Sequence, residues 1–240
     1  MKTRAVVVIP ALVLAAALFA LPSGGATTTK PATIPFGAAS IIVEKNATAG
    51  DAGLQFFLDS DDAWRSIVVR SPDGEKALDF HVRGHLKSFG LTELFSESNE
   101  PPFDELPLRE FLARFPAGVY RFSGTTIEGK QLAGTARLNH RIPRAPKDLS
   151  PRDGERVSRN RALIGWKPAQ QATGVHIDHY QVIVERDEPL RTFQVDLPAT
   201  ADHVAIPRTF LESGAEYKVE VLAVERGGNQ TITESDFVTR

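Results

Sequence analysis

The chain of 240 residues contains no cysteine, and it has one methionine, two tryptophans and three tyrosines. The absence of cysteine excludes disulfides, thiol catalysis, thiolate metal sites and a lipid anchor attached through an amino-terminal cysteine. The charge is nearly balanced, because 28 Lys and Arg residues accompany 30 Asp and Glu residues. The basic residues are also dispersed, so we expect no nucleic-acid partner. Because no glycine-rich phosphate loop is present either, we expect no cofactor.

Long apolar runs are lacking too, apart from one near the amino terminus. Lys2 and Arg4 precede an uncharged run over residues 5–21, which small residues follow. This order predicts a secretory signal peptide over residues 1–26. A retained anchor is the alternative, although the run is short for a membrane span and Pro10 interrupts it. We therefore expect an exported protein, periplasmic or extracellular, that meets a membrane only through this segment if the segment is uncleaved.

The last hundred residues show a second strong pattern. Apolar and polar residues alternate around Ile164 and Trp166, and again over residues 180–184 and 217–223. This period of two is typical of strands that have one buried face. Glycine and proline turn signals separate the runs. The pattern predicts seven short strands.

Residues 145–240 resemble the fibronectin type III family. Three motifs carry the resemblance: Ala145-Pro-Lys-Asp-Leu149, Ile164-Gly-Trp166-Lys-Pro168 and Phe210-Leu-Glu-Ser-Gly-Ala-Glu-Tyr217. The resemblance implies a β-sandwich whose core contains Trp166, Tyr180 and Tyr217, with the Tyr217 hydroxyl bonded to nearby backbone. It also implies a binding or spacing module rather than a catalyst. The loop over residues 226–230 lacks the Arg-Gly-Asp tripeptide, so receptor binding of that kind is not expected.

The region before this segment has the length of one further domain. Residues 27–40 are rich in Thr, Pro, Ala and Gly and predict an extended linker. Residues 41–143 contain several strand-like runs and one stretch of helical spacing, formed by Leu108, Phe111, Leu112 and Phe115. We expect a short helix over residues 107–115.

The segment Phe115-Pro-Ala-Gly-Val-Tyr120 parallels the one that ends at Tyr217, so the first domain is expected to be immunoglobulin-like as well. The predicted fold is all-β: two immunoglobulin-like β-sandwich domains in tandem, over residues 41–143 and 145–240. The first carries the short helix in a connecting loop, and a proline-stiffened joint over residues 140–146 separates the domains.

Acidic residues crowd the approach to the predicted helix, namely Glu93, Glu97, Glu100, Asp104, Glu105 and Glu110. Paired carboxylates can cleave glycosides, but a polar loop before the positive end of a helix explains the same pattern. We expect no catalytic residue and no metal site. We expect a ligand to contact Glu97, Glu100 and Asp104, together with Arg83 and His85.

These patterns predict an exported, non-enzymatic binding or adaptor module that recognises an envelope or extracellular protein, or a glycan. An exported protein of two small domains without disulfides is typical of a bacterial envelope. Two alternatives stay open: an accessory component of an extracellular carbohydrate-processing system, and a structural spacer. Asn46-Ala-Thr48 and Asn229-Gln-Thr231 match the glycosylation sequon, which matters only in a host that glycosylates secreted proteins.

Overall fold

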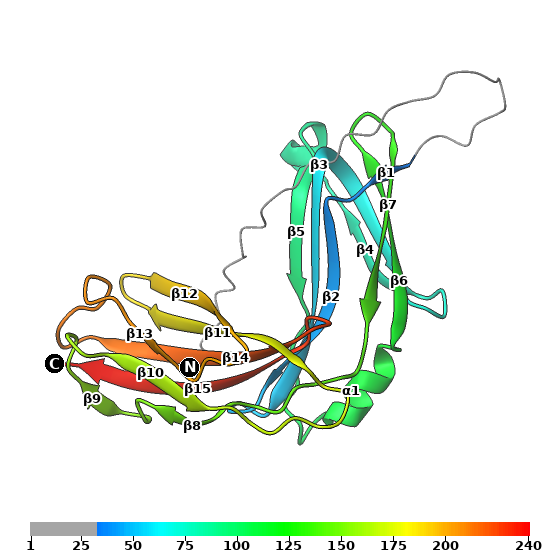
Figure 1. The fold of residues 1–240 in the computed structure, drawn as a ribbon. Coiled ribbons are helices and arrows are strands. Elements are labelled where there is room, and N and C mark those ends of the chain that lie inside the picture. The colour runs from blue at the N-terminus through cyan, green and yellow to red at the C-terminus, as the bar shows by residue number, and fades with distance from the viewer. Residues whose placement is uncertain (1–32) are drawn as a thin grey trace, which may run out of the picture. The chain divides into compact units, whose positions relative to one another are not determined.

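The structure, a computed structural model, describes residues 33–240, whose strands form two β-sandwiches (Figure 1). The predicted signal segment and the first part of the predicted linker lie outside the described residues. The described chain is all-β with one short α-helix, which confirms the predicted fold class. None of the helices within residues 33–240 has the length and apolar character needed to cross a membrane.

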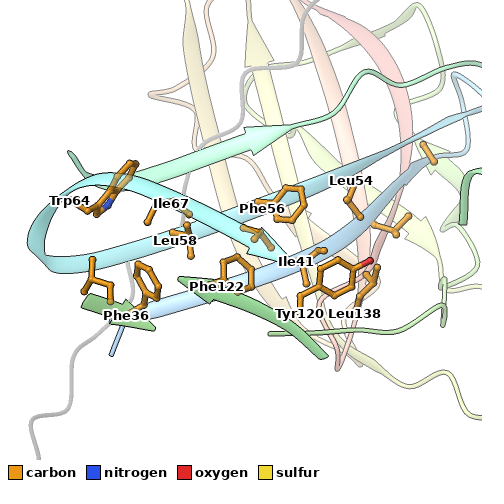
Figure 2. Packing of buried hydrophobic residues seen from close by; sticks show 14 of the residues in the cluster. Phe36, Ile41, Leu54, Phe56, Leu58, Trp64, Ile67, Tyr120, Phe122 and Leu138 are labelled. Atoms are coloured by element: carbon orange, nitrogen blue, oxygen red, sulfur yellow. The ribbon is translucent and has the colours of Figure 1, made fainter. Parts of the chain in front are cut away.

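The first sandwich is built around the long strand β3 (Asp51–Arg70). The first half of β3 pairs with β2 and β5, and the second half pairs with β4 and β6. The register shifts between Asp59 and Trp64, and Figure 2 shows the ribbon curving back beside Trp64. The other strands are β1 (Ile34–Pro35), β2 (Ala38–Asn46), β4 (Lys76–His81), β5 (Leu91–Glu97), β6 (Gly118–Thr126) and β7 (Gln131–Leu138).

The apolar residues of these strands form one core (Figure 2). Trp64 and Phe36 lie toward one end of it, and Tyr120 and Leu138 lie toward the other. The predicted linker over residues 27–40 is therefore too long, because Phe36 is buried and Ile34 pairs with Leu132 of β7. A chain segment that buries an aromatic ring against a core cannot behave as a solvated spacer.

The predicted helix is confirmed as α1 (Leu108–Arg114), which connects β5 to β6. Pro107 precedes it, and the Pro107 carbonyl accepts the backbone N–H groups of Glu110 and Phe111. Phe111 is the buried residue of the helix, and its ring lies 5.2 Å from that of Phe115. The helical spacing thus marks the face that packs on the sandwich.

The second sandwich consists of two sheets packed face to face, as the resemblance implied. One has the order β13-β10-β8, and the other places β12, β11, β14 and β15 side by side. Trp166, Tyr180 and Tyr217 all lie in the core between them. The strands are β8 (Lys147–Ser150), β9 (Glu155–Val157), β10 (Leu163–Lys167), β11 (Ile177–Arg186), β12 (Arg191–Pro198), β13 (His203–Ala205), β14 (Glu216–Glu225) and β15 (Gln230–Thr239).

The two sandwiches share backbone pairing, and Thr33–Arg240 forms one compact unit. β15 pairs in parallel with β2, from Gln230 opposite Glu44 to Ile232 opposite Asn46. Beside this pairing, the buried Asn229 accepts the backbone N–H of Val43 at 2.9 Å and donates to the Asn139 carbonyl at 2.9 Å. The Asn229 side chain is therefore occupied and buried, so this sequon cannot carry a glycan.

Tyr217 and Tyr120 differ in the hydrogen bonding of their hydroxyl groups. The backbone N–H of Glu212 donates to the Tyr217 hydroxyl at 2.8 Å, which confirms the predicted bond between this hydroxyl and nearby backbone. Tyr120 lies at the corresponding place in the first sandwich, but its hydroxyl is buried without a hydrogen-bond partner in the described part of the chain. Burial raises the pKa of Tyr120 to about 12. The parallel between the domains thus holds for the ring and not for the hydroxyl.

This difference predicts opposite outcomes for the same substitution. Tyr217→Phe removes a made hydrogen bond and should lower the free energy of unfolding by about 1 kcal/mol. Tyr120→Phe removes a buried hydroxyl that has no partner, so stability should be unchanged or raised. Urea denaturation of both variants measures the difference. Equal losses of unfolding free energy in the two variants would show that the hydrogen bond of the Tyr217 hydroxyl contributes nothing to stability.

Candidate functional site

Three glutamates from different parts of the first sandwich converge. Glu44, Glu97 and Glu100 each offer a carboxylate oxygen, and these oxygens all lie within 4.8 Å of one another. Glu44 is buried, with 7% of its surface exposed, and the other two are partly buried. We call these three residues the carboxylate cluster.

Strand pairing brings the cluster together. Glu44 of β2 lies opposite Gly53 of β3, and Glu97 ends β5 opposite Gln55 of β3. The Gln55 side-chain amide donates to the Glu97 carboxylate at 2.8 Å, which fixes that side chain. β3 therefore acts as the central strand that sets Glu44 and Glu97 on one face.

Glu100 reaches the cluster because Gly53 has no side chain. A Cβ at Gly53 would lie 3.1 Å from both Cγ and Oε1 of Glu100. The segment after β5 is also held along β3. The Ser98 N–H donates to the Leu54 carbonyl at 2.9 Å, and the Leu54 N–H donates to the Ser98 hydroxyl at 2.9 Å. The acidic segment expected to be an irregular loop is thus partly attached to the sheet.

The electrostatics of the cluster are unfavourable for three ionised groups. Burial, and next the charge of Glu97, raise the pKa of Glu44 to about 8. The same two causes raise the pKa of Glu100 to about 7. A hydrogen bond from the Gln230 side chain to Glu44 opposes the shift without cancelling it. At neutral pH the cluster therefore retains protons that exposed glutamates would release.

The described residues supply no cationic side chain to the cluster. None of the salt bridges within residues 33–240 involves Glu44, Glu97 or Glu100. On the neighbouring strands, Lys218 pairs with Glu220 at 2.7 Å and with Glu234 at 2.6 Å, so its charge is already matched. Carboxylate oxygens at the spacing of the cluster suit an incoming cation, either a basic side chain or a hard metal ion.

The structure unites two of the five expected ligand-binding residues, Glu97 and Glu100. Asp104 is exposed in the turn that precedes α1 and lies outside the cluster. Arg83 and His85 come before β5, whereas Glu97 ends it, so these two groups lie at opposite ends of that strand. The expected ligand-binding residues are therefore divided between separate parts of the first sandwich.

Sequence reasoning missed Glu44, although a signal for it existed. β2 continues past Ile41 and Val43 to Asn46, so it includes Glu44. Continuing the alternation of Ile41 and Val43 places Glu44 on the opposite face, in a strand that has no exposed residue. A glutamate at such a position is unusual and marks a candidate site.

Comparison with known proteins adds information on fold similarity alone. No family model and no curated protein matches the sequence. Matching solved structures include a two-domain fibronectin type III segment of chicken tenascin, 14% identical, covering 84% of this chain and 97% of that one at a TM-score of 0.34. Another is the FN1–FN3 segment of chicken CNTN1, 12% identical, covering 88% of this chain and 68% of that one at a TM-score of 0.36.

Proposed function

We propose that this chain is an exported, non-enzymatic binding module that takes a basic side chain of an envelope protein at Glu44, Glu97 and Glu100. The observation that carries the proposal is the convergence of three carboxylates without a cationic partner among the described residues. Export rests on the charged start, apolar run and small residues of segment 1–26.

The positive charge of a lysine or arginine would balance the negative charge of the carboxylate cluster. An arriving cation favours the ionised carboxylates, so binding releases the protons that Glu44 and Glu100 hold. Because their pKa values are about 8 and about 7, binding should strengthen as the pH rises from 6 to 8. A ligand that does not interact with these carboxylates would show no such dependence.

The function is tested by comparing two double variants of the exported protein. Glu97→Gln with Glu100→Gln removes two ionisable carboxyl groups from the cluster and keeps the side-chain sizes. Asp104→Asn with Glu105→Gln removes two exposed charges outside it and serves as the control. We expect the first variant to lose at least about tenfold in affinity for envelope proteins that the wild type captures, while thermal stability is kept. The control should bind like the wild type.

The readouts separate the alternatives. Captured proteins are identified by mass spectrometry, and their affinities are then measured with purified components at pH 6 and pH 8. Equal binding by both variants would contradict the proposed location. If calorimetry shows that the wild type and the control bind calcium and the cluster variant does not, the ligand of the cluster is a metal ion and not a basic side chain. Glycoside hydrolysis that only this variant loses would favour an enzyme, and capture of no protein at all would favour the spacer.

A further inference from the structure

A short tip between β4 and β5 exposes two large apolar side chains. It comprises residues 83–89 and contains the 3₁₀ helix η1 (Gly84–Ser88), which has no buried residue. Phe89 is 71% exposed and Leu86 is 52% exposed. Water-exposed Phe and Leu side chains next to each other mark an interaction surface.

The geometry of the tip directs both side chains the same way. The backbone N–H of Phe89 donates to the Leu86 carbonyl at 3.0 Å, and that of Gly90 donates to it at 2.8 Å. Side chains three residues apart lie above one another in a 3₁₀ turn, so Leu86 and Phe89 share a face.

The base of the tip is anchored to the sandwich. The Val82 N–H donates to the Arg65 carbonyl at 2.8 Å. At the other end, Gly90 has a φ of +72°, and a Cβ there would lie 2.8 Å from the Trp64 carbonyl oxygen. The apolar pair is therefore presented by a fixed turn and not by a long free loop.

The charges of the tip are all of one sign. Arg83 precedes the apolar pair, Lys87 lies between its two members, and residues 83–90 contain no acidic residue. Neither cation forms a salt bridge within the described part of the chain. Gly90, at the base of the tip, lies against Ala63 and Ile127, and the segments 61–63 and 126–130 around them carry acidic residues of their own. Binding to an anionic surface must therefore depend on the apolar pair as well as on Arg83 and Lys87.

We propose that this tip inserts Phe89 and Leu86 into the surface of an anionic lipid bilayer, with Arg83 and Lys87 at the level of the phosphate groups. Aromatic and aliphatic side chains enter the boundary between headgroups and acyl chains, while nearby basic residues attract anionic lipids. A protein partner fits less well, because a stable interface buries about 800 Å² on each side and the tip offers only seven residues. The inference is independent of the carboxylate cluster.

Vesicle binding tests the proposal on residues 33–240, which contain every described element and both cores. We expect this protein to sediment with vesicles of phosphatidylcholine and phosphatidylglycerol in equal parts, and far less with phosphatidylcholine alone. Leu86→Ser with Phe89→Ser should weaken binding at least about tenfold. Arg83→Gln with Lys87→Gln should weaken it about fivefold for each charge removed.

Two other exposed leucines provide the matched control. Leu163 and Leu190 are 47% and 55% exposed on the second sandwich, so Leu163→Ser with Leu190→Ser should bind vesicles like the wild type. An equal loss in this control would show nonspecific apolar adsorption and would overturn the proposal.

The absence of cysteine allows a direct readout of insertion. Phe89→Cys and Leu190→Cys can each be labelled at a single position with a polarity-sensitive dye. We expect a blue shift on vesicle addition at position 89 and none at position 190. The absence of a shift at position 89 with every vesicle would overturn lipid insertion. The proposal would also be overturned if the Leu86→Ser, Phe89→Ser variant kept vesicle binding but no longer bound an envelope protein that the wild type captures.

Discussion

Trp166→Ala should lower the free energy of unfolding of the second sandwich by about 3–5 kcal/mol. The Trp166 side chain is 5% exposed, and its ring lies 5.3 Å from that of Tyr180 between the two sheets. Removing the indole leaves a cavity that the two sheets cannot easily close, because the backbone hydrogen bonds within each sheet keep it stiff. Chemical denaturation followed by circular dichroism measures the loss.

Trp166→Phe provides the control for this prediction. It retains most of the ring volume and removes an indole N–H that has no hydrogen-bond partner among residues 33–240. We expect a loss of less than about 1.5 kcal/mol, because the unpaired N–H contributes nothing favourable. If Trp166→Ala itself cost less than about 1 kcal/mol, the placement of Trp166 in the core would be wrong.

Glu44→Gln should stabilise the protein at pH 8 and have little effect at pH 5. The pKa of Glu44 is about 8 in the folded protein, against 4.5 for an ordinary glutamate. Between these values the folded state holds a proton that the unfolded state releases, so stability is full below pH 4.5 and falls as the pH rises toward 8. Glutamine has the same shape without the ionisation, and it removes a loss on the order of 2–4 kcal/mol.

The measurement is the free energy of unfolding of the wild type and the variant at pH 5 and pH 8. Glu105→Gln, which removes an exposed charge outside the cluster, should leave the pH dependence of the wild type intact. A Glu44→Gln variant whose stability changes with pH as steeply as that of the wild type would show that Glu44 is ionised in the folded protein.

Local patterns in the sequence determined the kinds of element and their buried faces. The spacing of Leu108 and Phe111 predicted α1, and the alternation around Trp166 predicted a strand with that ring in the core. The motif ending at Tyr217 predicted a bond between its hydroxyl and nearby backbone, and the structure has this bond at Glu212. Each of these features depends on residues close together in the chain, so periodicity and turn chemistry suffice to indicate them.

Tertiary structure alone decided which strands are neighbours. Alternation shows which face of a strand is buried, but it does not show that Glu44, Glu97 and Glu100 meet across β3. Nor does it show that Asn229 bonds to Val43, 186 residues away, and ties β15 to β2. Backbone N–H and C=O groups are alike in every strand, so they do not determine which strands pair. Strand pairing depends on the packing of both cores, and it decides where the three carboxylates meet.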